Sequence, residues 1–291
     1  MIKFKKNNKI VVLGSKGFIG SNLIQKYKQL NIKTLGISRK DIDFMSYKSS
    51  QKLSKIINDG DLILNAVAIA PSKTIEDLEN NIVIIKNIQK GINKKLYKYI
   101  NISSDAIYPD KSSKLTERDK PDPTSIHGLM HLNREKIINL SSNCKVIHAR
   151  STLVYGFGDP HEGYGPNLFY KNSTKKKIIE IFGNGEEIRD HIFIDELVDL
   201  IFKISFKNFS GPINLVTGHG ITFKQIANFY KKYYKKIKII KKRRTQKIPH
   251  NGYRLFNNKK LKILFPKFKF NDFETNIENM IKKYNEENQS S

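Results

Sequence analysis

The chain has 291 residues, with 53 lysines and arginines against 27 acidic residues and a formal net charge of +26. A hydrophobic content of 38% suffices for a packed core, which excludes bulk disorder, and a single cysteine, Cys144, excludes an intrachain disulfide and a cysteine-rich metal site. No apolar run is long enough to cross a bilayer, and the first residues carry no signal-peptide pattern. We therefore expect a cytoplasmic protein with no membrane partner.

The positive charge does not by itself indicate a nucleic-acid partner. Eight of the 53 basic residues are arginines, and the lysines are spread along the whole chain. We expect a solvated basic surface and no nucleic acid. The one dense run, Lys231–Lys247, alternates cations with isoleucines and fits a strand with one solvated face. Attraction of an anionic substrate, and binding of nucleic acid or an acidic membrane, are the alternatives for this run.

Short apolar runs alternate with helical patterns over the first half of the chain. Strands are predicted at Lys9–Leu13, Lys33–Ile37, Asp61–Ala68, Tyr97–Ser103 and Lys145–Ala149. Helices are predicted at Phe18–Leu30, Ser46–Asn58, Ile75–Ile92 and from Pro123 to Leu140. This alternation predicts an α/β fold in which a Rossmann-like, doubly wound parallel sheet is covered by helices on both faces.

The pattern changes after Arg150, where glycine and proline become frequent. A strand at Ile192–Ile194, a helix at Asp195–Ile204 and a strand at Pro212–Val216 are predicted to return to the same sheet. Asn271–Asn285 has the spacing of an amphipathic helix.

These patterns predict two domains. A dinucleotide-binding domain is expected over residues 1–150, with returning segments near 190–216. A smaller, interleaved α/β C-terminal domain is expected over 151–189 and 217–291, and its task would be to bind the substrate.

A glycine-rich loop (GSKGFIG) lies between the first strand and the first helix. Its glycines allow a tight turn and the close approach of a pyrophosphate, and the helix N-terminus supplies N–H groups and a positive dipole end. The order of strand, turn and helix predicts a dinucleotide site in preference to a purely structural turn. The residues assigned to this site are Gly14, Lys16, Gly17, Phe18, Ile19 and Gly20.

The end of the second strand bears on the choice of cofactor. An acidic residue there hydrogen-bonds the ribose hydroxyls of NAD, whereas this chain has Ser38 and Arg39, which suit a 2′-phosphate. Lys16, inside the glycine loop, adds a second cation. We therefore favour NADP(H) as the cofactor, with NAD(H) as the alternative if both cations point to solvent.

Several segments together resemble the extended short-chain dehydrogenase/reductase family, of the NAD-dependent epimerase/dehydratase type. They are GSKGFIG, DLILNAVA, NISSDAIYP and GNGEEIRDHIFIDEL. The resemblance covers nearly the whole chain, and the SRKDIDF segment is most similar to the reductases of the family. It implies an NAD(P) cofactor, a nucleotide-sugar substrate and assembly as a homodimer.

The resemblance also assigns roles to individual residues. Further cofactor contacts are implied for Asp43, Phe44, Ala66, Val67, Ala68, Asn81 and Ser103. Ser104 takes the place of the catalytic hydroxyl, and Asp105 beside it is expected to contact the sugar or support a protonated imidazole. Asn167 and Arg189 match positions that bind the substrate's diphosphate, and Arg254 is a weaker match to such a position.

The chain departs from the family at the catalytic pair, a Tyr followed four residues later by a Lys. In PTSIHGLMHLNRE these become His127 and His131. The i, i+4 spacing places both on one helix face, and imidazole titrates near 6.5, so a histidine can exchange protons near neutrality. We expect Ser104 to hold a keto oxygen, His127 to supply the proton, and His131 to position the nicotinamide ribose and so contact the cofactor.

Two alternatives remain for the chemistry. Another group, such as Asp105, Tyr108 or Tyr155, would act as the acid or base, or the protein would bind cofactor and nucleotide sugar without turnover. Histidines at i and i+4 also suit a metal, with Asp159, His161 and Glu162 as further candidates, but HGLMH lacks the glutamate of HExxH, and we expect no metal.

The sequence therefore predicts an NAD(P)-dependent oxidoreductase that acts on a nucleotide-activated sugar. The most specific form of this prediction is a 4-keto reductase, with epimerisation or dehydration as related activities.

Overall fold

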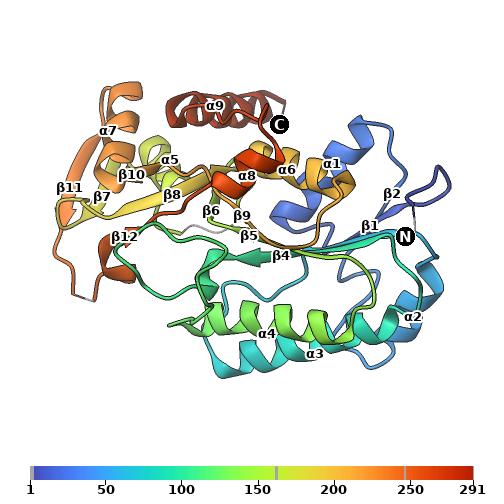
Figure 1. The fold of residues 1–291 in the computed structure, drawn as a ribbon. Coiled ribbons are helices and arrows are strands. Elements are labelled where there is room, and N and C mark those ends of the chain that lie inside the picture. Colours follow the sequence, from blue (N-terminus) through green and yellow to red (C-terminus); the bar gives the residue numbers. More distant parts are fainter. Residues whose placement is uncertain (1–2, 161–162, 246, 291) are drawn as a thin grey trace. The chain divides into compact units, whose positions relative to one another are not determined.

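The computed structural model describes residues 3–160, 163–245 and 247–290, and Figure 1 labels its elements. The chain divides into two compact units, each built from separate segments. The first unit comprises Met1–Pro109, Glu117–Ser151 and Leu197–Leu215, and the second comprises Asp110–Thr116, Thr152–Glu196 and Val216–Ser291. The short segment Asp110–Thr116, which the sequence placed in the first domain, thus belongs to the second unit.

The sheet of the first unit has six strands in the order β2-β1-β3-β4-β5-β9, and every neighbouring pair is parallel. The strands are β1 (Ile10–Leu13), β2 (Thr34–Ile37), β3 (Leu62–Asn65), β4 (Lys98–Ser104), β5 (Val146–Ser151) and β9 (Gly211–Leu215). The apolar runs of β1 and β3 are buried along their whole length, as a parallel sheet covered on both faces requires. The predicted Rossmann-like parallel sheet is therefore confirmed.

Helices cover both faces of this sheet (Figure 1). They are α1 (Phe18–Gln29), α2 (Ser49–Ile56), α3 (Ile75–Gly91), α4 (Ile126–Ser141) and α6 (Ile194–Phe206), with a short 3-10 turn η1 (Asp105–Ile107) after β4. On one face, α2, α3 and α4 enclose a core with β1–β4. On the other, the Tyr27 hydroxyl of α1 hydrogen-bonds Ser205 of α6 at 2.6 Å.

Local signals explain where the helices nearest the site begin. α3 starts with a capping box, in which the Thr74 side chain accepts from the Asp77 N–H and the Asp77 side chain accepts from the Thr74 N–H. α4 is capped by Ser125, the residue before its first turn, whose hydroxyl accepts from the N–H of Gly128. α1 has no side-chain cap at its N-cap residue Gly17, so the cap residue supplies no acceptor for the N–H groups of the first turn.

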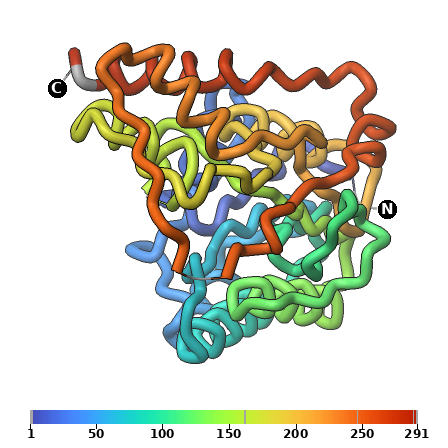
Figure 2. The backbone as a smooth tube through the Cα atoms, turned by 90° about the vertical axis from the view of Figure 1, so that its left-hand side faces the viewer, coloured from blue at the N-terminus to red at the C-terminus, as the bar shows by residue number. Residues whose placement is uncertain are grey.

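The second unit contains two smaller sheets. In one, β8 (Ile188–Phe193) pairs with β6 (Leu153–Tyr155), β10 (Gly220–Thr222) and β12 (Tyr253–Arg254). In the other, β7 (Ile178–Phe182) pairs with β11 (Lys238–Lys242). The helices are α5 (Pro166–Lys175), α7 (Phe223–Tyr233), α8 (Lys259–Leu264) and α9 (Phe273–Ser290), with a 3-10 turn η2 (Pro249–Gly252) before β12. Figure 2 follows this part of the chain from α7 and β11, in orange, to α9, in red.

The predicted strand at Ile192–Ile194 does not return to the large sheet, and this prediction was wrong. The segment forms β8, whose partners are β6, β10 and β12. Asp190, in the middle of β8, is fully buried, and its carboxylate accepts from the N–H groups of Thr217 and Gly218, just before β10. A buried carboxylate needs such donors, and they fix β8 in the smaller sheet.

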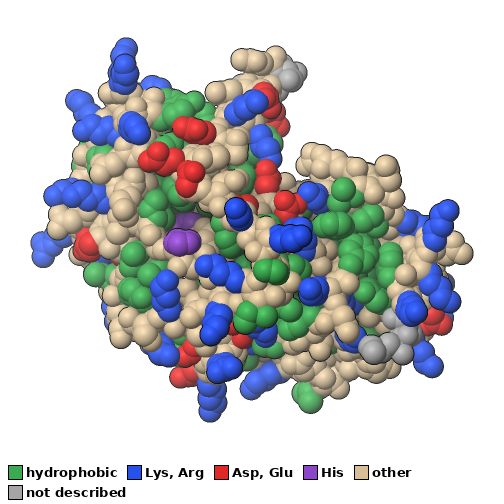
Figure 3. Space-filling view, turned by 45° about the horizontal axis from the view of Figure 1, so that its top comes forward, with side chains coloured by type: hydrophobic (Ala, Val, Ile, Leu, Met, Phe, Trp, Pro, Cys, Tyr) green, Lys and Arg blue, Asp and Glu red, His purple; other side chains and the backbone are tan. Residues whose placement is uncertain are grey.

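The basic run Lys231–Lys247 splits between two elements. Lys231 and Lys232 lie in the last turn of α7, and Lys238–Lys242 form β11, which is exposed except at the half-buried Ile239. Figure 3 shows lysine and arginine side chains scattered over the viewed face, without a single concentrated patch. None of the helices in the described ranges is long and apolar enough to span a membrane.

Candidate cofactor and active site

The glycine loop is tightly packed against the chain that follows β3. Gly14 has a positive φ of 82°, and a Cβ there would lie 3.0 Å from the backbone carbonyl of Ala66. A Cβ on Gly20 would lie 2.1 Å from the Gly14 oxygen, so only glycine fits at this position in the first turn of α1. Gly17 differs, because its φ is −74° and its nearest neighbour would be 3.3 Å away. A side chain at Gly17 would thus be crowded against the Gly14 carbonyl, and without one a phosphate can approach the N-terminus of α1 closely.

A pocket of about 290 Å³ lies at the carboxyl ends of β1, β2 and β3, beside the glycine loop. Its volume is near the lower end of the range for small-molecule sites. It gathers most of the residues predicted to contact the cofactor, namely Gly14, Lys16, Gly17, Ser38, Arg39, Asp43, Phe44, Ala66, Val67 and Ala68. Phe18, Ile19, Gly20, Asn81, Ser103 and His131, predicted for the same role, do not line it.

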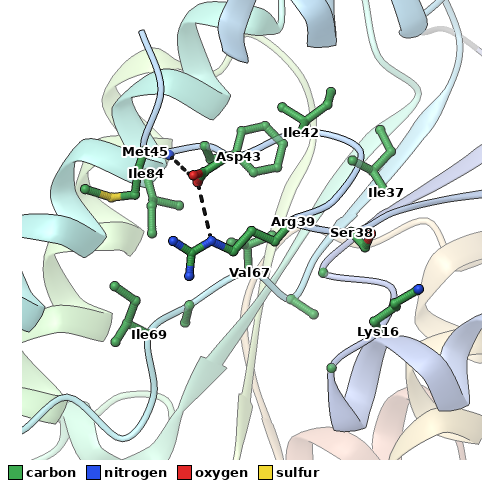
Figure 4. A pocket seen from close by; sticks show the side chains of 15 residues that line it. Lys16, Ile37, Ser38, Arg39, Ile42, Asp43, Met45, Val67, Ile69 and Ile84 are labelled. Carbon is green, nitrogen blue, oxygen red and sulfur yellow. Dashed lines mark hydrogen bonds and ion pairs between the residues drawn. The ribbon is translucent and has the colours of Figure 1, made fainter. Parts of the chain in front are cut away.

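The sequence did not identify the apolar wall of this pocket. Ile37, Ile42, Met45, Ile69 and Ile84 line it as well (Figure 4). Apolar walls with a few polar groups at the rim suit a flat heterocycle such as adenine. Ile42 and Phe44 alternate with Asp41 and Asp43, and this alternation after β2 was the available signal.

Charged groups on the segment after β2 pair with one another. Arg39, which is 83% exposed, lies across the pocket toward Asp43, with its Nε 3.7 Å from Oδ1 (Figure 4). Asp41 Oδ2 accepts from the Ser38 N–H at 2.8 Å and from the Ser38 hydroxyl at 2.6 Å. These two donors, with Lys16 nearby, hold the pKa of the Asp41 carboxyl below its usual range. Sequence reasoning missed Asp41, although the Ser-x-x-Asp spacing was visible.

Asn81 organises the loop that follows β3. It is fully buried, its Oδ1 accepts from the Ile69 N–H at 3.0 Å, and its Nδ2 donates to the Ile69 carbonyl at 3.0 Å and to the Asp77 carbonyl at 2.7 Å. The same amide donates to the Ser72 hydroxyl at 3.2 Å. Asn81 therefore fixes the course of residues 69–72, which pass between the pocket and α4.

The two histidines of α4 lie with their rings perpendicular and 4.7 Å apart between centroids. His127 Nδ1 accepts a hydrogen bond from the Ser72 backbone N–H at 3.4 Å. His131 is buried, and its Nδ1 has no hydrogen-bond partner among the described residues. Burial, together with nearby Arg134 and His127, lowers the pKa of His131 well below its usual range, so this ring is neutral at physiological pH.

Ser103 and Ser104 end β4 but differ in their surroundings. The buried Ser103 hydroxyl donates to Glu135 at 2.6 Å, within a network that includes Arg150. The half-buried Ser104 hydroxyl donates to the Asp105 carboxylate at 3.3 Å and accepts from the Ala106 N–H. Ser104 and Asp105 therefore form the more accessible polar pair at this strand end.

The two tyrosines considered as alternative acids, Tyr108 and Tyr155, are both buried in the protein. The Tyr108 hydroxyl donates to Asn214 at 2.7 Å and accepts from Arg150 at 2.8 Å, and burial raises the pKa of Tyr108 to about 12. Tyr155, in the second unit, is buried, and its pKa is raised well above the usual range by that burial. Both are buried and are weaker acids than an ordinary tyrosine, which leaves Asp105, at a half-buried position, as the alternative group.

The residues predicted to bind the substrate's diphosphate lie in the second unit. Arg189 and Arg254 are register partners on β8 and β12, and both are buried. Arg189 donates to Glu187 and to the Pro249 carbonyl, each at 2.6 Å.

Arg254 lies 3.8 Å from the Asp110 carboxylate. Asn167, at the start of α5, is engaged with both the N–H and the carbonyl of Gly156. The two arginines are thus adjacent, whereas Asn167 shapes the turn before α5.

No group of three or more histidine, cysteine, aspartate or glutamate side chains in the described ranges is arranged to hold a metal ion. His161 and Glu162, considered as metal ligands with Asp159, lie outside those ranges.

A Rossmann-like parallel sheet with a glycine loop after its first strand defines a dinucleotide-binding α/β protein. Residues 10–215 match the model of the NAD dependent epimerase/dehydratase family, and the chain belongs to this family. It is 26% identical to ADP-L-glycero-D-manno-heptose-6-epimerase from Brachyspira hyodysenteriae, over 79% of this chain and 82% of that protein.

Two solved structures show the same fold. GDP-L-fucose synthetase from Naegleria fowleri bound to NADP has a TM-score of 0.80 at 18% identity, covering 100% of this chain and 96% of that one. UDP-glucuronic acid 4-epimerase from Bacillus cereus, in complex with UDP-glucuronic acid and NAD, has a TM-score of 0.80 at 21% identity, covering 94% and 97%.

Proposed function

We propose that this protein is an NAD(P)-dependent oxidoreductase that reduces a 4-keto group on a nucleotide-activated sugar. The observation that carries the proposal is the pocket at the carboxyl ends of β1, β2 and β3, where the glycine loop, two cations and an apolar wall meet. The family match and the nucleotide-sugar enzymes among the similar proteins support the substrate class.

The fit of a dinucleotide rests on the loop geometry. Gly17, which lines the pocket without a side chain, and the uncapped start of α1 suit a pyrophosphate, and the apolar wall suits adenine. When bound, the nicotinamide supplies hydride transfer. Lys16 and Arg39 support NADP(H) over NAD(H), because both line the pocket and carry positive charge.

The chemistry at the sugar would fall to Ser104, His127 and His131. With Nδ1 of His127 accepting from Ser72, the neutral ring has its proton on Nε2, where it can donate to a substrate oxygen. Ser104 would hold that oxygen from the end of β4. His131 would hydrogen-bond the nicotinamide ribose as a neutral group, without the charge of a lysine.

Arg189 and Arg254, on adjacent strands, and Asn167 would bind the diphosphate of the nucleotide sugar. Asp105 would contact the sugar. The first unit would be the dinucleotide-binding domain. A homodimeric assembly and a cytoplasmic location stay predictions.

The test is oxidation of NADPH with a panel of 4-keto sugar nucleotides. Turnover in the wild type that is lost in His127→Ala and kept in His219→Ala, at an exposed histidine, supports the proposal. Turnover in His127→Ala that equals that of the wild type rules out a catalytic role for His127. A preference for NADH over NADPH contradicts the cofactor assignment.

A second candidate function is binding without turnover. It is favoured by one observation, the neutral state of His131 at the position where the family has a cationic lysine. Binding of NADPH and of nucleotide sugars without oxidation of NADPH on any substrate of the panel would establish it.

A further inference from the structure

One carboxylate beside the cofactor pocket was not assigned a role by the sequence. Asp41 follows β2 and is exposed, and it holds both the backbone N–H and the hydroxyl of Ser38, at 2.8 and 2.6 Å. Ser38 itself lines the pocket. The end of β2 is the place where dinucleotide-binding sheets distinguish a 2′-hydroxyl from a 2′-phosphate.

The hydrogen bond from Ser38 to Asp41 changes what Ser38 can offer a ligand. A serine hydroxyl has one proton to donate, and here that proton points to the carboxylate. Toward the pocket, the Ser38 oxygen is left as an acceptor. An acceptor suits the 2′-hydroxyl of NAD, which has a proton to donate, and gives no hydrogen bond to a 2′-phosphate dianion.

Each of the two cations at the pocket also has an aspartate in its neighbourhood. Lys16 lies close enough to Asp41 to influence its ionisation, and Arg39 Nε is 3.7 Å from Asp43 (Figure 4). A phosphate that enters between these cations meets their carboxylate partners as well. Like charges at such distances repel, and the repulsion offsets part of the attraction by the cations.

We propose that Asp41 is a specificity-determining residue that lowers the affinity of this pocket for a 2′-phosphorylated dinucleotide relative to a 2′-hydroxyl one. It acts through Ser38, whose hydroxyl it engages, and through Lys16, whose charge it offsets. The proposal rests on the proposed function in one respect, namely that the pocket takes the adenosine half of NAD(P). Asp41 thus restrains the NADP preference that Lys16 and Arg39 create.

The substitution Asp41→Asn separates charge from structure. Because the Ser38 N–H and hydroxyl both bond to Oδ2, an asparagine oxygen in its place can still accept from both, so the turn after β2 is kept and only the negative charge is removed. Asp59→Asn is a matched control. Asp59 is also an exposed aspartate that accepts from a backbone N–H, that of Lys95. It precedes β3 and therefore lies at the amino-terminal ends of the parallel strands, away from the pocket at their carboxyl ends.

The experiment measures dissociation constants by calorimetry for NADP⁺ and NAD⁺, and for adenosine 2′,5′-bisphosphate and AMP. We expect Asp41→Asn to bind NADP⁺ and the bisphosphate about tenfold more tightly and to bind NAD⁺ and AMP as the wild type does. Asp59→Asn should leave all four constants unchanged. Because Asp41 is exposed, salt screens its charge. The gain in affinity for NADP⁺ in Asp41→Asn should therefore become smaller when the salt concentration rises from 20 to 300 mM.

The outcomes separate this inference from the proposed function. If the wild type binds the dinucleotides but Asp41→Asn changes NADP⁺ and NAD⁺ binding equally or not at all, the role of Asp41 is wrong and the cofactor site stands. If the wild type binds none of the four ligands, both the cofactor site and the role of Asp41 are wrong. Circular dichroism melting curves for each variant exclude misfolding as the cause.

Discussion

The backbone N–H of Ser72 donates a hydrogen bond to Nδ1 of His127, although 55 residues separate the two positions in the sequence. Ser72 is held in turn by the buried amide of Asn81, which also binds both polar backbone groups of Ile69. The loop after β3 therefore sets the tautomer of a histidine on α4. A ring that accepts at Nδ1 keeps its proton on Nε2, and a second proton on Nδ1 would face the Ser72 N–H.

Proton transfer by His127 should therefore be separable from hydrogen bonding by substitution. The amide nitrogen of Gln reaches the place of Nε2, but an amide donates a hydrogen bond without releasing its proton near neutrality. If Nε2 supplies the proton, His127→Gln should lose NADPH oxidation about as fully as His127→Ala, and the loss of such a donor typically lowers kcat by about 10²- to 10³-fold. A loss of less than about tenfold in His127→Gln would show that the ring acts only as a hydrogen-bond donor.

The glycine loop predicts opposite results for two alanine substitutions. A Cβ on Gly20 would meet the Gly14 oxygen at 2.1 Å, so Gly20→Ala should lower the free energy of unfolding by about 1–3 kcal/mol, the usual effect of overpacking. Gly17→Ala has an ordinary φ, and its methyl would meet the Gly14 oxygen at 3.3 Å, a tight contact that a small shift relieves, so it should cost much less stability than Gly20→Ala. Its methyl would fill the cradle and weaken NADP⁺ binding by about tenfold, or about 1.4 kcal/mol.

Urea unfolding and calorimetry check the two effects independently. A Gly17→Ala variant that is destabilised as strongly as Gly20→Ala would contradict this reading of the loop.

Glu135 and Arg150 form a buried, two-bonded ion pair, with Oε2–Nη2 and Oε1–Nε distances of 2.6 and 3.0 Å. Loss of one partner leaves an uncompensated buried charge, which typically costs about 3–5 kcal/mol. We expect this loss of unfolding free energy in Arg150→Met, measured by urea denaturation. The double variant Glu135→Leu/Arg150→Met should be less destabilised than either single one. Additive losses would contradict direct coupling of the pair.

Stability should fall in mild acid because of His148. Burial lowers the pKa of His148 from 6.5 to about 4, against the opposing charge of Glu135 and with help from Arg150 and Arg134. Between these values the unfolded chain binds a proton that the folded chain does not, so the stabilisation is complete above pH 6.5 and is lost as the pH falls toward 4. From pH 7 to pH 5 we expect a loss of about 2 kcal/mol from this group.

The variant His148→Gln removes the titrating group. The change in its unfolding free energy between pH 7 and pH 5 should be smaller than that of the wild type by the same amount. An unchanged pH dependence would show that His148 is protonated in the folded protein.

Periodic patterns identified the elements of the first unit well. The runs of β1 and β3 and the helical spacing of α1, α3 and α4 gave bounds within a few residues, because each element buries one continuous face in the large sheet. The glycine loop pointed to the pocket for the same local reason, since its chemistry is contained in seven consecutive residues.

Features that depend on distant partners could not be read from the sequence. β8 looks like a strand of the large sheet until the donors from Thr217 and Gly218 to Asp190 are known. Arg189 reads as a free cation, although Glu187 and Pro249 already engage it. The Ser72 hydrogen bond to His127 likewise depends on how the loop after β3 meets α4.

The buried Lys98 has a consequence for the order in which the protein is made. Its ammonium group, at the start of β4, donates to the carbonyls of Ile204, Ser205 and Lys207, at the end of α6, and β9 then completes the sheet beside β5. When only residues 1–150 have emerged from the ribosome, Lys98 does not yet have its carbonyl acceptors, and β5 is an edge strand that still lacks β9. The dinucleotide-binding half of this protein is therefore finished only after translation has reached Leu215, well into the second half of the chain.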